Sequence, residues 1–210
     1  MKSKVLACIL LVSTLLAEGA ARAQEPSDFG IWQSINLKGK VSNTVSLGFW
    51  TEHRSKTSAR DLDCALVMPY VNYTPLKWLQ LGYASEYIIA ASGRYVTCRP
   101  SATLLLGSGP LSFQFRVLPI YEHSLDRGTG TWTLRTRGKV ACRIADTAWK
   151  PYMSCELFTA GVWKKTRYCA GTTWSFGRHS GLDLFYMYYV MGGASVRERH
   201  ILGVGYSFSI

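Results

Sequence analysis

The sequence predicts an all-β protein, a single antiparallel transmembrane β-barrel of about 10–12 strands. Two observations lead to this prediction. From residue 29 to the end of the chain, apolar and polar residues alternate in segments of about ten to fourteen residues, the periodicity of membrane-spanning strands. Turn residues separate these segments, and no amphipathic helical pattern interrupts them.

The last residues, 199–210, form the most regular of these strands. Small and polar residues alternate with a face of large apolar ones, which are Leu202, Val204, Tyr206, Phe208 and Ile210. A strand that is apolar outside and small or polar inside resembles the closing strand of outer-membrane barrels. The resemblance implies an outer-membrane location and recognition of strand 199–210 by the barrel assembly machinery.

The first 23 residues have the three parts of a secretory signal peptide. Two early lysines give a basic start, a short apolar run follows, and Ala21 and Ala23 form a small-residue cleavage site. We therefore expect a cleaved leader over 1–23 and one barrel domain over 24–210. No later run approaches about 18 uninterrupted apolar residues, so no transmembrane helix is expected.

The chain of 210 residues is basic, with a formal net charge of +11. Cleavage would remove three basic residues and one acidic residue, which leaves +9. A basic balance often indicates nucleic acid, but an exported barrel meets phosphorylated lipid instead. We therefore expect outer-membrane lipid, lipopolysaccharide and small anionic solutes as partners, and no nucleic acid.

Five cysteines follow the leader: Cys64, Cys98, Cys142, Cys155 and Cys169. An odd number cannot be fully paired, and no C-x-x-C or H-E-x-x-H spacing occurs, so no metal and no cofactor is expected. Cys142 and Cys155 fall in consecutive segments and could face each other across a hairpin. A cross-strand disulfide is geometrically demanding, so free thiols are expected, although the pairing stays open.

Eleven segments follow the leader, over residues 29–39, 43–54, 61–74, 77–90, 95–107, 110–122, 130–144, 150–160, 165–176, 180–191 and 198–210. An antiparallel barrel closes only with an even number of strands, so ten or twelve strands are expected. The role of the first segment stays open. Tight turns alternate with longer connections, and we expect the tight turns to face the periplasm.

Segment 130–144 carries four cationic side chains on one face and apolar ones such as Trp132 and Leu134 on the other. A cationic face suits a hydrated lumen. The same alternation elsewhere completes the predicted basic lumen lining, which is Arg116, Arg135, Arg137, Lys139, Arg143 and Arg167. Two interpretations remain open: a narrow, porin-like pore that favours anions, or a structural barrel plugged by paired charges.

Basic residues are more frequent near the longer connections than near the tight turns. Arg and Lys at strand ends can neutralise lipopolysaccharide phosphates through charge-assisted hydrogen bonds. We therefore predict that Lys164, Lys165 and Arg197 contact lipopolysaccharide head groups.

No catalytic residues are predicted, and the protein is expected not to be an enzyme. His179, Ser180 and Asp183 include the residue types of a hydrolytic triad, but adjacent residues of a strand point to opposite faces. His53 and Ser55 share a face near the expected exterior, where a lipid-modifying hydrolase would act. That hydrolase is the alternative function.

Several stretches together resemble an uncharacterised outer-membrane barrel family catalogued as domain of unknown function 2490. They include Asp28-Phe29-Gly30-Ile31-Trp32, Glu52-His53-Arg54, residues 73–83, 150–158 and 179–184, and the final 199–206. The resemblance spans nearly the whole mature chain and implies a membrane barrel without an assigned activity. The chain departs from the usual barrel ending because it finishes in Ile210 instead of an aromatic residue.

Overall fold

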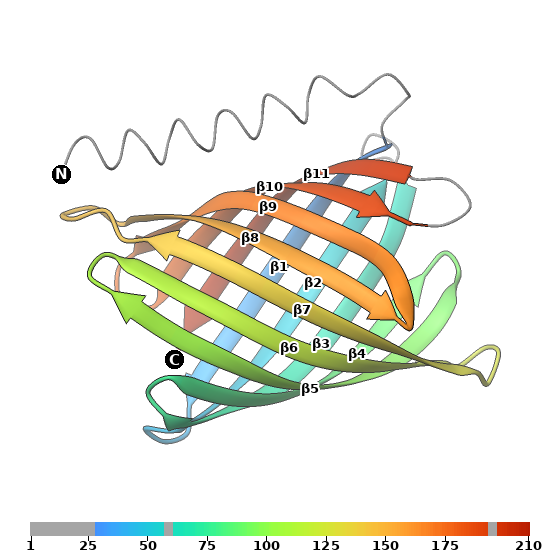
Figure 1. The fold of residues 1–210 in the computed structure, drawn as a ribbon, viewed down its shortest axis with the longest axis horizontal. Helices are drawn as coiled ribbons and strands as arrows, with labels where there is room; N and C mark the ends of the chain where they lie inside the picture. Colours follow the sequence, from blue (N-terminus) through green and yellow to red (C-terminus); the bar gives the residue numbers. More distant parts are fainter. Residues whose placement is uncertain (1–27, 57–60, 193–196) are drawn as a thin grey trace.

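The computed structural model describes residues 28–56, 61–192 and 197–210, which form one closed barrel of eleven strands (Figure 1). The strands are β1 (Asp28–Lys40), β2 (Val45–Lys56), β3 (Asp61–Leu76), β4 (Leu79–Ala90), β5 (Gly93–Ser108), β6 (Leu111–Ser124), β7 (Gly130–Cys142), β8 (Trp149–Ala160), β9 (Val162–Phe176), β10 (Ser180–Met191) and β11 (Arg197–Ser209). The all-β class and the predicted range of strand number are confirmed. The predicted leader lies outside the described residues.

The barrel closes through a parallel pair. β1 and β11 run in the same direction, in a register from Asp28 opposite Arg199 to Lys38 opposite Ser209, and all other neighbouring strands are antiparallel. The expectation of an even strand number is therefore wrong. Strands that alternate in direction bring an odd-numbered last strand parallel to the first, and a parallel ladder is only slightly less stable.

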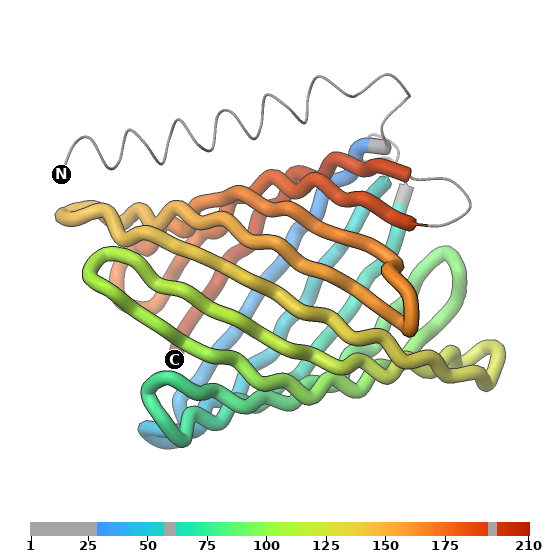
Figure 2. The backbone as a smooth tube through the Cα atoms, in the orientation of Figure 1, coloured from blue at the N-terminus to red at the C-terminus, as the bar shows by residue number. Residues whose placement is uncertain are grey.

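The two ends of the barrel carry connections of similar length. We call the end where β1 begins the N-terminal rim, and the other end, where the chain also finishes, the C-terminal rim (Figure 2). Gly161 alone joins β8 to β9 at the N-terminal rim, in the left-handed conformation (φ 76°) that glycine tolerates. Residues 143–148 join β7 to β8 at the C-terminal rim. The expected division into longer and tighter connections is thus wrong for these two.

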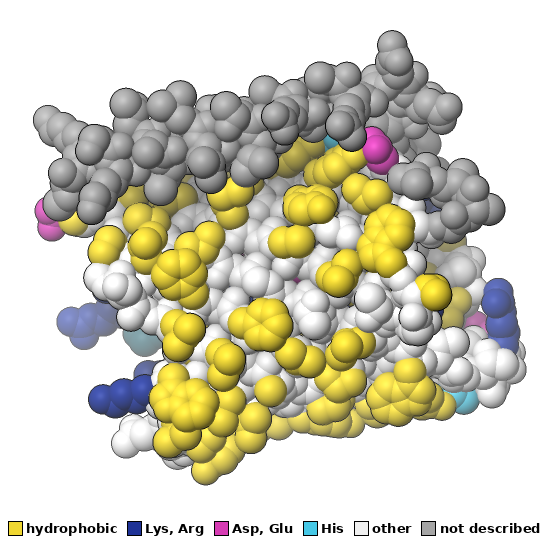
Figure 3. Space-filling view, in the orientation of Figure 1, with side chains coloured by type: hydrophobic (Ala, Val, Ile, Leu, Met, Phe, Trp, Pro, Cys, Tyr) yellow, Lys and Arg dark blue, Asp and Glu magenta, His cyan; other side chains and the backbone are white. Residues whose placement is uncertain are grey.

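Large apolar side chains cover the outside of the barrel. Leu202, Tyr206 and Phe208 are exposed, whereas Ile201, on the opposite face of β11, is fully buried. The face shown in Figure 3 carries hydrophobic side chains across the wall, and its Lys and Arg side chains lie toward the two ends. The apolar-out alternation of the closing strand is therefore present in the fold. No helix among the described residues is long and apolar enough to cross a membrane.

The inner face near the closing pair is tightly packed. Trp32, Met187, Tyr189 and Ile201 form a buried cluster from β1, β10 and β11. Gly203 is required beside it, because a Cβ at this position would lie 1.9 Å from the ring of Phe185. The small residues on the inner face of β11 therefore make room for large residues of neighbouring strands.

Candidate functional site

The half of the lumen nearer the N-terminal rim is filled by side chains. Inward residues from strands around the whole barrel are buried there: Trp32, Leu66, Glu86, Thr97, Leu118, Phe158, Tyr189 and Ile201. These residues come from eight of the eleven strands, so the filling is not confined to one wall. Buried side chains therefore crowd this half of the lumen.

An arginine, Arg167, lies among these buried side chains. The Arg167 guanidinium lies 5.0, 4.7 and 4.9 Å from the ring centroids of Trp32, Phe158 and Tyr189, and Arg54 lies 4.2 Å from Trp32. Cations attract the faces of aromatic rings, most strongly where water is excluded. We call Trp32, Phe158, Tyr189 and Arg167 the aromatic plug.

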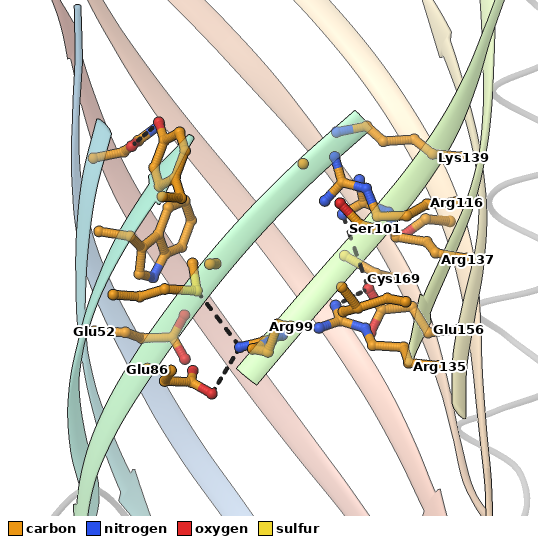
Figure 4. Close-up of a pocket in the computed structure, with 18 of the residues that line it drawn as sticks. Glu52, Glu86, Arg99, Ser101, Arg116, Arg135, Arg137, Lys139, Glu156 and Cys169 are labelled. Carbon is orange, nitrogen blue, oxygen red and sulfur yellow. Dashed lines mark hydrogen bonds and ion pairs between the residues drawn. The ribbon is translucent and has the colours of Figure 1, made fainter. Parts of the chain in front are cut away.

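Ion pairs adjoin the plug. Glu156 is buried and accepts a hydrogen bond from Arg135 at 2.5 Å, with Arg167 at 3.5 Å and Arg137 at 4.0 Å. Three more carboxylates are paired: Glu86 with Arg99 at 2.7 Å (Figure 4), Asp63 with Arg199 at 2.9 Å, and Glu52 with Arg54. Among the described carboxylates, Glu156 therefore has the most guanidinium groups within 4.0 Å, with Arg135 the nearest and Arg137 the farthest.

A cavity of about 530 Å³ occupies the remaining lumen. It reaches from the plug residues Trp32 and Arg167 to Lys38 and Gln80 near the C-terminal rim. Eight Arg or Lys side chains and four Asp or Glu side chains line it, a formal excess of four positive charges. Such a lining can attract and hold an anion.

Five of the six basic residues predicted for the lumen line this cavity: Arg116, Arg135, Arg137, Lys139 and Arg167. The prediction for Arg143 is wrong. β7 ends at Cys142, and Arg143 lies exposed in the connection that follows, where the strand alternation no longer fixes its direction. The plug aromatics were not predicted, although Trp32 shares a face with the polar Ser34, Asn36 and Lys38.

The three residues predicted to contact lipopolysaccharide do not share one environment. Lys164 and Arg197 are exposed near the N-terminal rim. Lys165 instead points inward, with its amine 4.5 Å from the ring centroid of Phe158 and 5.7 Å from that of Tyr189, so its prediction as a surface contact is wrong. β9 begins at Val162, earlier than expected, which places Lys165 within the strand and on its inner face.

The expected excess of basic residues at one rim is also reduced. Arg54 and Lys165, which contributed to it, face the lumen. Arg94 is engaged by the loop residue Asp126, which accepts hydrogen bonds from its backbone N–H and from its guanidinium, both at 2.7 Å. These two donors hold the pKa of the Asp126 carboxyl below its usual range. The charge asymmetry therefore gives little support to an orientation.

The two candidate catalytic groups are not assembled as hydrolytic sites. The Ser55 hydroxyl donates to the Ile31 carbonyl at 3.2 Å and accepts from the Ile31 N–H at 3.3 Å, while His53 is exposed on the outer wall. A nucleophile needs a base within hydrogen-bond reach. At the other candidate, the residues bond elsewhere: His179 to the Ser209 carbonyl, Ser180 to Tyr206, and Asp183 to Tyr152 and Thr173.

The five cysteines are free. The expected proximity of Cys142 and Cys155 is wrong, because Cys155 lies opposite Gly138 in the β7–β8 ladder and Cys142 lies opposite Leu111 on β6. No group of three or more His, Cys, Asp or Glu side chains among the described residues is placed to hold a metal ion.

These features define a closed all-β barrel with an apolar outer wall and a charged, partly filled interior. A family model described as a protein of unknown function (DUF2490) matches residues 29–208. The chain belongs to this family, which confirms the resemblance seen in the sequence. No curated protein matches the chain.

Proposed function

We propose that this protein is an outer-membrane β-barrel without a catalytic site, closed by its aromatic plug and carrying a basic vestibule that favours anions. One observation carries the proposal: polarity is reversed relative to a water-soluble protein. Large apolar side chains face outward along the strands, while the lumen holds the charged ones. In a membrane, lipid would surround the apolar outer side chains and water would solvate the charged side chains of the lumen.

Aromatic residues near both rims support a membrane setting. Trp149 and Trp174 stack at 5.3 Å near the C-terminal rim, and Tyr121 and Trp132 lie 5.0 Å apart near the N-terminal rim. Girdles of aromatic side chains mark the two interfaces of membrane-spanning barrels. The separation of these pairs along the strands fits two such girdles.

The presence of the plug favours a vestibule that is closed at one end and argues against an open pore. All four plug side chains are buried, and the cavity runs from two of them, Trp32 and Arg167, toward Lys38 near the C-terminal rim. The excess of positive charge in the cavity lining favours anionic solutes there. This arrangement combines the two interpretations from the sequence: a plugged barrel with an anion-favouring lumen.

An outer-membrane location also implies binding partners for this protein. The exposed Lys164 and Arg197 are suited to phosphate groups of lipopolysaccharide, if the N-terminal rim faces the exterior. The apolar-out strand β11 is suited to recognition by the barrel assembly machinery. The bonds of Ser55 to the Ile31 backbone argue against the alternative of a lipid-modifying hydrolase.

Cell fractionation with gel electrophoresis tests the proposed location. We expect the protein in the outer-membrane fraction and expect it to migrate faster before boiling than after, because a folded barrel resists the detergent. Recovery from the soluble periplasmic fraction, with identical migration before and after heating, would contradict the proposal.

A further inference from the structure

The basic side chains of the lumen differ in how closely they are compensated. Five arginines have a carboxylate oxygen within 3.5 Å: Arg54, Arg99, Arg135, Arg167 and Arg199. Within the described part of the chain, Arg116 and Lys139 have no carboxylate within 4.0 Å. Arg137 reaches Glu156 only at 4.0 Å, at an oxygen that Arg135 already holds at 2.5 Å. Three cationic groups on β6 and β7 therefore lack a close counter-charge.

These three groups gather on one wall of the cavity. Arg116 and Arg137 lie directly opposite each other in the β6–β7 ladder, and Lys139 occupies the next inward position (Figure 4). Like charges directly opposite across a ladder destabilise a sheet. Their closest partners are neutral: Arg116 donates to the Thr103 hydroxyl at 2.9 Å, and the Lys139 amine lies 3.5 Å from the Tyr152 ring centroid.

We propose that Arg116, Arg137 and Lys139 form a binding site for a phosphate-class oxyanion. A dianion would relieve the repulsion among the three cations, and guanidinium groups bind tetrahedral oxyanions through paired hydrogen bonds. The Arg137 Nε atom is buried and has no hydrogen-bond partner among the described residues. Ser101 and Ser154 line the same cavity and add hydroxyl groups.

The opposite wall of the cavity indicates that the ligand has an apolar group in addition to its phosphate. Trp50, Met68 and Tyr70 line the cavity from β2 and β3. A volume of about 530 Å³ lies in the range of small-molecule sites and exceeds the needs of a bare phosphate ion. Free phosphate and a phosphomonoester with an apolar group share the recognised chemistry, and the apolar wall favours the monoester. The inference rests on the proposed function in one respect: the ligand enters the cavity from the C-terminal rim.

Calorimetric titration of the detergent-solubilised mature protein tests the site, with inorganic phosphate and with phenyl phosphate as ligands. We expect both to bind, with phenyl phosphate tighter. Loss of charge-assisted hydrogen bonds weakens binding by about tenfold per arginine, so Arg116→Gln with Arg137→Gln should weaken it by about 100-fold. The matched control, Lys40→Gln with Lys77→Gln, removes the same charge at the C-terminal rim and should leave binding unchanged.

A second variant and a stability measurement separate binding from folding. Arg137→Lys keeps the charge but removes the buried Nε donor, and it should weaken binding several-fold. In phosphate-free buffer, the double arginine variant should resist urea at least as well as the unaltered protein, because a like-charge pair is gone.

Three results would overturn the site: no heat with either ligand, equal binding by the double variant, or a double variant that is less stable without phosphate. The last result would assign the arginines to the fold. Because the titration uses solubilised protein, its failure is distinguishable from a failure of the fractionation experiment.

Discussion

Replacement of Glu156 by Gln is expected to lower the free energy of unfolding of the barrel by roughly 3 kcal/mol. The change keeps the size of the side chain but removes the one carboxylate shared by Arg135, Arg137 and Arg167. The guanidinium groups would then repel one another in a largely buried setting. Urea unfolding of the protein in lipid vesicles, followed by the migration shift on gels, measures the loss.

Glu86→Gln is the matched comparison, since Glu86 is also buried but, among the described residues, has only the Arg99 guanidinium within 4 Å. We expect a loss of about half the size. Equal losses in the two variants, or an unchanged stability after Glu156→Gln, would show that Glu156 does not hold the three arginines together.

Removal of two plug rings is expected to turn a silent barrel into a conducting one. The unaltered protein should give no current above background in planar bilayers, because the lumen near the N-terminal rim is filled. Phe158→Ala with Tyr189→Ala takes away two of the three rings around Arg167. Discrete conductance steps should appear and favour anions, because basic groups dominate the lining.

Phe113→Ala with Phe115→Ala is the control, because it removes two rings from the exposed outer wall and should leave the barrel silent. Gel migration before and after heating confirms that each variant is folded. Currents of equal size from the unaltered protein, or a folded plug variant without current, would refute the role of the plug.

The strands could be predicted closely because alternation and turn residues are local signals. Segment 180–191 coincides with β10, and most other boundaries shift by only a few residues. The strand number could not be settled, since alternation is the same in parallel and antiparallel pairs. Only the register of β1 against β11 shows that the ends of the chain meet in parallel.

Whether a side chain points inward or outward could be predicted within the strands. The prediction failed near the strand ends. Arg135, Arg137 and Lys139 lie inside a regular part of β7 and point into the cavity. Arg143 lies beyond the end of β7, where alternation no longer applies. Lys165 is in phase with the inward Arg167, and its prediction failed because β9 begins at Val162, three residues earlier than the expected segment.

The ion pairs between inward side chains could not be predicted from the sequence. Alternation assigned Glu156 and several arginines to the same lumen, but it could not show which of them meet. The triple contact of Glu156 depends on the β7–β8 and β8–β9 registers, which bring Arg137 and Arg167 opposite it on either side. The incomplete compensation of Arg116 has the same origin, because its partner across the ladder is Arg137.

Tryptophan fluorescence in lipid vesicles tests most directly whether the apolar outer wall faces lipid. Of the seven tryptophans, five are exposed on the outer wall or rims, namely Trp78, Trp132, Trp149, Trp163 and Trp174, while Trp32 and Trp50 line the lumen. Lipids brominated near the head-group end of the acyl chain should quench most of the emission, and aqueous iodide should quench little of it. Strong quenching by iodide with little effect of the brominated lipid would show that the outer wall faces water, and would contradict the membrane barrel.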